Sequence, residues 1–120
     1  SCEYLLIEEQ VSNQAGNYKG LTQEALLTCE EDFLALFDAL PDVLTWIELG
    51  SGHGLGPLLF AEKFPHKKAI GVEFEKARLD VGEKKRIQLA LSNVEFHHAD
   101  LLTCPIPIGD VYFLYFSNYN

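Results

Sequence analysis

The fold of this chain follows from Val43-Leu-Thr-Trp-Ile-Glu-Leu-Gly-Ser-Gly-His-Gly-Leu-Gly-Pro57, an apolar run that breaks into four alternating glycines and then into a helical pattern. The run carries only Glu48 as a charge, which is typical of a strand buried on both faces. The glycines let the backbone take positive φ and approach a ligand closely. Pro57 suits a helix start, because its missing N–H would be unpaired there anyway. The stretch predicts a strand, a loop and a helix N-terminus that form an anion-tolerant ligand site.

The spacing of the glycines separates the ligand classes that use such a loop. A phosphate-binding P-loop needs G-x-x-x-x-G-K-[ST], and the sequence contains no Gly-Lys dipeptide. The dinucleotide fingerprint G-x-G-x-x-G/A fails in every register, because its third position falls on Leu55, Pro57 or Leu59. A P-loop is therefore excluded, and a nicotinamide dinucleotide site is a weak alternative.

The pattern that remains, Glu48-x-Gly50-x-Gly52-x-Gly54, resembles motif I of the class I S-adenosylmethionine-dependent methyltransferases. In that family the loop wraps the methionine half of the cofactor, and the leading acid helps to hold its amino group. The resemblance implies S-adenosylmethionine as cofactor and S-adenosylhomocysteine (SAH) as product. It also implies a first set of cofactor contacts, namely Glu48, Gly50, Ser51, Gly52 and Gly54.

Two later segments support the resemblance. Gly71-Val-Glu73 ends the next predicted strand with an acid, 21 positions after Gly52, and an acid there can accept hydrogen bonds from both ribose hydroxyls. Phe74 follows directly and is a candidate to pack on the adenine ring, although a core role is equally compatible. His98-Ala-Asp-Leu-Leu102 resembles the segment whose acid receives the adenine amino group, so Asp100 and Leu101 complete the expected cofactor site.

The rest of the chain alternates predicted helices and strands. A helix begins at Thr22 or Thr28 and ends at Leu40 before Pro41, and a short helix follows the glycine loop. The other predicted elements are a strand over 68–74, a helix over 75–91, and strands over 94–98 and 110–116. This order indicates an α/β fold with a Rossmann-like parallel sheet, whose ligand lies at the carboxyl ends of the strands. The apolar run of the last strand predicts cover on both of its faces.

The resemblance also sets an expected domain organisation. The family fold has seven strands and this chain accounts for four, so residues 21–120 are expected to be the cofactor-binding part of a truncated domain. Residues 1–20 are expected to be an N-terminal segment, either a plain extension or, as the resemblance implies, a lid over the cofactor. The lid candidates are Tyr18, Lys19 and the nearby Thr22. The fourth strand would expose an apolar edge, which an oligomer or a missing C-terminal half is expected to cover.

The methyl acceptor is left open by the sequence. Asn118 and Tyr119 follow the fourth strand, where the family contacts the acceptor, but they do not match the Asn/Asp/Ser-Pro-Pro-Tyr/Phe signature of nitrogen methylases. The segment loosely resembles the non-SET protein-lysine methyltransferases, so a protein lysine or a small molecule is expected. The alternative function is a non-catalytic class I fold that acts as an interaction domain or cofactor-binding fragment.

The charge distribution bears on partners and location. Residues 1–50 hold ten acids and one base, Lys19, so the net charge of −9 lies in the N-terminal part. This acidity disfavours a nucleic-acid partner and suits a basic protein, although a solvated acidic surface is the simpler interpretation. No run approaches the roughly 20 apolar residues of a membrane span. The odd, widely spaced cysteines favour idle thiols in a reducing cytoplasm, which predicts a cytoplasmic protein.

The histidines do not indicate a metal or a general base. His53 lies inside the glycine loop without a neighbour that would orient it, so a structural role is expected. His97 and His98 are adjacent on a predicted strand and point to opposite faces, which makes joint metal ligation difficult. No metal site is predicted.

Overall fold

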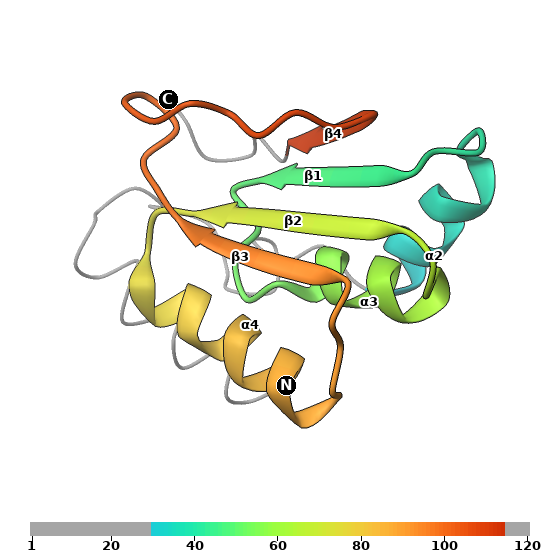
Figure 1. Cartoon of the computed structure of the whole chain (residues 1–120), viewed down its shortest axis with the longest axis horizontal. Helices are drawn as coiled ribbons and strands as arrows, with labels where there is room; N and C mark the ends of the chain where they lie inside the picture. The colour runs from blue at the N-terminus through green and yellow to red at the C-terminus, as the bar shows by residue number, and fades with distance from the viewer. Residues whose placement is uncertain (1–29, 115–120) are drawn as a thin grey trace, which may run out of the picture.

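The computed structural model describes residues 30–114 and contains a four-stranded sheet with the strand order β3-β2-β1-β4, in which every neighbouring pair is parallel (Figure 1). The elements are α2 (Glu30–Ala39), β1 (Thr45–Leu49), α3 (Leu55–Lys63), β2 (Lys68–Glu73), α4 (Lys76–Gln88), β3 (Val94–His98) and β4 (Val111–Leu114). The predicted α/β, Rossmann-like parallel sheet is confirmed. The predictions for the lid (Tyr18, Lys19, Thr22), for a helix start before residue 30 and for Asn118 and Tyr119 lie outside the described residues.

Most predicted boundaries agree with the structure within a few residues, and the largest difference is at the end of α4. This helix ends at Gln88 because Ala90 takes a left-handed conformation, with φ of 53°. The Leu91 amide then donates to the Arg86 carbonyl at 3.1 Å, which is the 6→1 bond of a Schellman motif. A left-handed alanine carries no sequence signal, so the pattern extended the helix too far.

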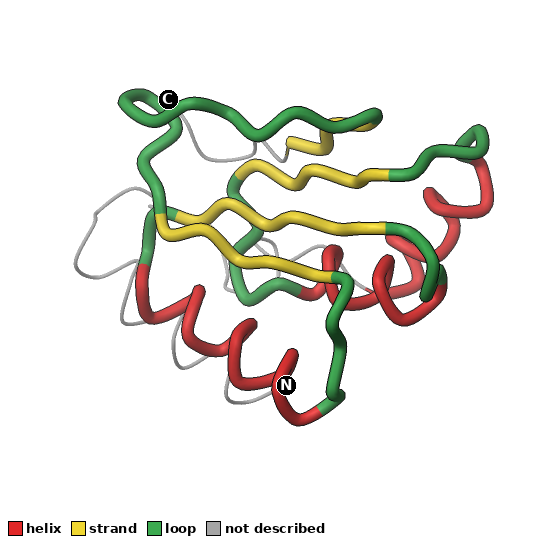
Figure 2. The backbone as a smooth tube through the Cα atoms, in the orientation of Figure 1, coloured by secondary structure: helices red, strands yellow, loops and turns green. Residues whose placement is uncertain are grey.

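The core lies mainly between the sheet and the helices. Trp46 from β1 is fully buried, stacks on Phe60 of α3 with ring centroids 5.7 Å apart, and meets Phe37 of α2 edge-on at 5.1 Å. The opposite face of the sheet has a smaller buried cluster, made of Ile47, Leu49, Ile70 and Val72. Figure 2 shows α3 and α4 on one side of the sheet, while the connection from β3 to β4 runs past the other side. Long apolar side chains thus hold the strands against α2 and α3.

The expectation that the fourth strand is covered on both faces is wrong for its described part. Phe113 packs between Phe33 and Trp46, with ring centroids 5.5 and 5.4 Å away. Tyr112 and Leu114, on the other face, are 48% and 37% exposed. β4 is at an edge of the sheet, and within residues 30–114 its aromatic contacts lie on the side that faces the helices. The apolar run predicted that both faces would be covered, whereas one face is.

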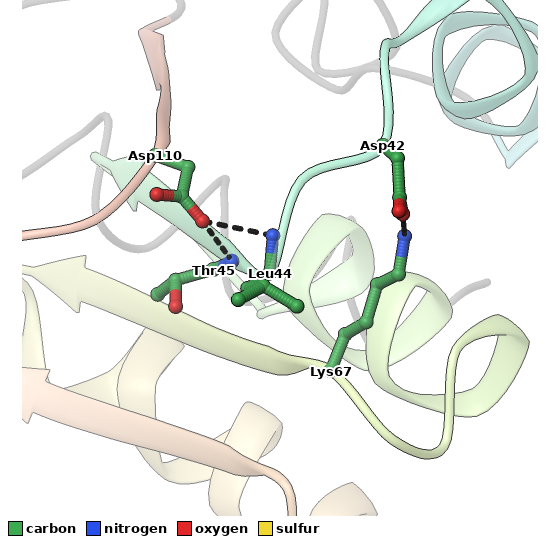
Figure 3. A network of polar contacts seen from close by, with 5 residues as sticks. All are labelled: Asp42, Leu44, Thr45, Lys67 and Asp110. Carbon is green, nitrogen blue, oxygen red and sulfur yellow. Dashed lines mark hydrogen bonds and ion pairs between the residues drawn. The ribbon is translucent and has the colours of Figure 1, made fainter.

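Two polar contacts connect segments at the amino ends of the strands (Figure 3). Asp110, just before β4, accepts hydrogen bonds at Oδ2 from the backbone amides of Leu44 and Thr45, at 2.8 and 3.0 Å. Lys67, just before β2, pairs with Asp42 at 2.6 Å. These contacts join the segments that enter the strands and lie away from the glycine loop. Within residues 30–114, no helix combines the length and hydrophobicity that a bilayer crossing requires.

Candidate functional site

The glycine loop between β1 and α3 adopts the backbone that its composition predicts. Gly50, Gly52 and Gly54 have positive φ angles of 76°, 60° and 85°, which side chains with a Cβ rarely adopt. The amides of Gly50 and Ser51 both donate to the Val72 carbonyl, at 2.8 and 2.9 Å, and tie the loop to β2. Among residues 30–114, a Cβ added at Gly50 or Gly52 would meet no atom within 4 Å. The first half of the loop therefore has an open surface that a ligand can approach.

The second half of the loop uses its glycines for packing. A Cβ at Gly54 would lie 2.6 Å from the Phe96 ring, and a Cβ at Gly56 would collide with the Glu48 carboxyl and the Phe33 ring. Gly82 of α4 is part of the same arrangement, because a Cβ there would lie 2.9 Å from the His53 carbonyl. Gly82 therefore lets the loop pack closely against α4, although a glycine inside a helix lowers the helix propensity.

Glu73 connects the loop to the end of β2. Its side chain is 4% exposed, and its Oε1 accepts a hydrogen bond from the Gly52 amide at 2.8 Å. Its Oε2 accepts one from the Glu75 amide at 2.8 Å and lies 3.7 Å from Nη1 of Arg78, which is also buried. Because each carboxylate oxygen can accept two hydrogen bonds, Glu73 retains capacity for further donors. The arrangement places a buried, charge-compensated acceptor beside the open surface of the loop.

Glu48 lies beneath the loop on the helix side of the sheet. It is 4% exposed, and its Oε1 accepts a hydrogen bond from the indole Nε1 of Trp46 at 3.2 Å. Burial raises the pKa of its carboxyl to about 8, while the hydrogen bond from Trp46 opposes this shift and the nearby charge of Glu73 adds to it. In this environment Glu48 is largely protonated at neutral pH.

The two other loop side chains, Ser51 and His53, are buried. Burial and the charge of Arg78 lower the pKa of His53 to about 4, so its ring is neutral at pH 7 and lacks the affinity for protons that a general base requires. The Ser51 hydroxyl has no hydrogen-bond partner in the described part of the chain and lies against Gly71, where an added Cβ would be 2.8 Å from Oγ. Both side chains pack inside the loop and leave its outer surface to the backbone.

The ends of β2 and β3 carry the remaining predicted residues. Phe74 is 60% exposed beside Glu73. Asp100 shapes the turn after β3, since its Oδ1 accepts from the Leu102 amide at 2.9 Å. Leu101 is half-buried and packs against the smaller core cluster that contains Ile47, so its side chain holds the turn against the sheet. His98 reaches from β3 to the Phe74 carbonyl, with Nε2 2.9 Å from the oxygen.

The structure therefore brings the glycine loop, Glu73 and Phe74 together at the carboxyl ends of the strands. The contact with His98 also connects Phe74 to β3. Sequence reasoning missed Arg78 and His98 as parts of this arrangement. Arg78 lies four positions before Gly82, on the same face of α4 that packs under the loop, and this i, i+4 spacing is a signal that could have found it. No group of three or more metal-ligating side chains is gathered within residues 30–114.

Comparison with known proteins agrees with these motifs. No protein-family model matches the chain. A tRNA (guanine-N(7)-)-methyltransferase of Porphyromonas gingivalis (strain ATCC BAA-308 / W83) is 36% identical over 55 residues, which cover 46% of this chain and 22% of that protein. The chain thus spans about a fifth of the length of this curated relative.

Two solved structures with a similar fold contain SAH or were crystallised in its presence. Coclaurine N-methyltransferase bound to N-methylheliamine and SAH matches with a TM-score of 0.61 and 23% identity, over 73% of this chain and 28% of that one. The N-terminal domain of EvdMO1, crystallised in the presence of SAH and D-fucose, matches with a TM-score of 0.57 and 27% identity, over 62% of this chain and 32% of that one. The motifs and the fold of this chain are thus similar to those of the class I S-adenosylmethionine-dependent methyltransferases.

Proposed function

We propose that this chain is the cofactor-binding part of an S-adenosylmethionine-dependent methyltransferase. The observation that carries the proposal is the hydrogen bond from the Gly52 amide to Glu73, which places a buried acceptor directly beside the open backbone of the glycine loop. This combination suits a ligand that has vicinal hydroxyls and a part that lies along a glycine backbone. The solved structures that contain SAH and the methyltransferase activity named for the curated relative support the same cofactor.

Each part of the cofactor has a proposed partner. Gly50, Ser51, Gly52 and Gly54 supply the backbone along the methionine part, Glu73 accepts from the ribose hydroxyls, and Phe74, Asp100 and Leu101 surround the adenine. Glu48 lies below the loop, where the ammonium of the methionine part would favour its ionised form. The bound cofactor supplies an activated methyl group on a sulfonium. The residues of this chain bind and orient that group and exclude water.

The acceptor is proposed only by class, as a protein lysine or a small molecule. A nucleic-acid acceptor has less support, because five of the basic side chains on and beside α3 and α4 already pair with acids, which reduces the positive charge offered to phosphates. These pairs are Lys63–Asp38, Lys67–Asp42, Lys68–Glu95, Lys76–Asp80 and Arg86–Glu83. The tRNA activity named for the curated relative is the observation that opposes this choice.

A second candidate function is a non-catalytic class I fold that acts as an interaction domain. β4 favours it, because this strand lies at an edge of the sheet and exposes Tyr112 and Leu114 on one face. An apolar edge strand of this kind invites pairing with another chain. Such a domain would not need an open glycine loop beside a buried carboxylate. A cofactor titration separates the two functions.

The test is thermal unfolding of the chain with S-adenosylmethionine, SAH and NAD in parallel. A ligand at about 100 times its dissociation constant stabilises the folded state by roughly 2.7 kcal/mol, which is a readable shift of the midpoint. We expect a shift with the first two ligands and none with NAD. A shift with NAD alone overturns the proposed cofactor, and no shift with any ligand moves the weight to the interaction domain.

A further inference from the structure

The turn after Glu73 is held from two sides. On the inner side, the Glu73 carboxylate accepts the Glu75 amide at 2.8 Å. On the outer side, Nε2 of His98 lies 2.9 Å from the Phe74 carbonyl. Because a carbonyl only accepts hydrogen bonds, Nε2 is the donor, both in the neutral Nε2–H tautomer and in the imidazolium. The link from His98 therefore survives protonation of the ring.

His98 contacts the backbone of Phe74, whose ring is 60% exposed and so has few packing contacts within the described residues. The backbone from which the ring projects is connected to β3 by His98, beside the hydrogen bond from the Ala99 amide to the Glu73 carbonyl at 3.1 Å. Removing the imidazole would free the Phe74 carbonyl and let the ring move away from the sheet.

We propose that His98 is a positioning residue, which holds the Phe74 ring where it covers the adenine of the bound cofactor. This inference rests on the proposed function. His98 does not contact the reacting methyl group, and its effect on the cofactor passes through Phe74. Loss of a single hydrogen bond of this kind, with the ring free to move, is expected to weaken cofactor binding by about three- to tenfold.

The chain contains a matched control one residue earlier. His97 pairs at Nε2 with Glu95, at 3.1 Å, and alternates with His98 along β3, so it faces the other side of the sheet. The His97→Ala variant removes the same atoms from the same strand without touching the turn. His98→Gln keeps a donor at the end of the side chain, whereas His98→Leu keeps bulk and has no donor.

The experiment measures the dissociation constants of SAH and of 5′-methylthioadenosine, which carries the adenine and the ribose without the amino-acid part. We expect His98→Ala and His98→Leu to weaken both ligands by about three- to tenfold, His98→Gln to recover most of the loss, and His97→Ala to match the wild type. In a Phe74→Ala background, His98→Ala should have little further effect, because the ring through which it acts is gone. The Glu75 amide should also exchange faster in His98→Ala without any ligand.

The outcomes distinguish the inference from the proposed function. If the wild type binds SAH and His98→Ala binds it equally well, the role of His98 is wrong and the proposed function stands. Equal losses in His98→Gln and His98→Ala, or equal losses with and without the Phe74 ring, also overturn it, because they indicate a general structural role. If the wild type binds neither ligand, both proposals fail. His98→Leu replaces the alanine variant in each comparison if that variant does not fold.

Discussion

Asp110 and Glu73 use the same chemistry at opposite ends of the sheet. Each carboxylate accepts two backbone amides, from Leu44 and Thr45 for Asp110 and from Gly52 and Glu75 for Glu73. Asp110 is exposed, whereas Glu73 is buried beside the buried Arg78. Water competes for the first set of hydrogen bonds and is largely excluded from the second. One carboxylate therefore helps to assemble the strands, and the other maintains a preformed acceptor at the ligand site.

The largest expected effect is that of Glu73→Ala. This variant removes the anchor of the loop and one member of the buried ion pair with Arg78, and loss of one partner of a buried pair typically costs about 3–5 kcal/mol of unfolding free energy. Urea denaturation measures that loss, and an SAH titration should show no binding at concentrations that saturate the wild type. Glu73→Gln is the matched control for shape, since it keeps the volume and loses the charge. If Glu73→Ala lost no more unfolding free energy than Asp110→Ala, the contrast between the carboxyl and the amino ends of the sheet would be wrong.

The next effect concerns the pH dependence of stability at Glu48. Burial raises the pKa of Glu48 to about 8 in the folded state from its ordinary value of 4.5, so its contribution to stability is full below pH 4.5 and is lost as the pH rises through 8. Between these values, the unfolding free energy should fall by about 1.4 kcal/mol per pH unit from this group. Glu48→Gln should remove that slope in urea denaturation series at pH 5 to 8. An unchanged slope would mean that Glu48 is ionised in the folded protein.

A smaller effect is expected for Asp110→Ala. Two backbone amides lose a solvent-exposed acceptor, and water replaces it in part, so the cost is about 1 kcal/mol. Urea denaturation measures the loss. SAH affinity should stay unchanged, because Asp110 lies at the amino ends of the strands, away from the glycine loop. A change in affinity as large as that of any variant at Glu73 would show that the two ends are coupled.

The smallest effect is expected at the Asp42–Lys67 pair. Lys67 lowers the pKa of Asp42 through a hydrogen bond and then through its charge, but the Asp42 carboxyl is solvent-exposed. Above pH 5 this carboxyl is ionised in the folded and the unfolded state, so it adds no pH dependence there. Asp42→Asn should leave the midpoint of thermal unfolding at pH 7 within measurement error. A clear loss would mean that the amino ends of the strands depend on ion pairing more than their exposure suggests.

Much of the fold could be read from local patterns. The strand over Val94–His98 agrees with the prediction residue for residue, and β2 ends one residue before the predicted end at Phe74. These segments are short apolar or alternating runs, and such runs have few other ways to bury their side chains. Gly50, Gly52 and Glu73 could be predicted as parts of one site because motif order and a parallel sheet bring the strand ends to the same edge.

What the chain alone could not reveal depends on residues that are distant in sequence. The protonated state of Glu48 requires the burial that α2, α3 and Trp46 create, since desolvation is a property of the assembled core. The pairing of Arg78 with Glu73 and the contact of His98 with Phe74 each join two elements whose register no local pattern encodes. The sequence therefore determined the strands, the glycine loop and the edge that carries the proposed ligand site, because these follow from periodicity and backbone freedom. Only the tertiary structure decided the charge states and the positioning contacts, because these depend on which side chains exclude water from one another.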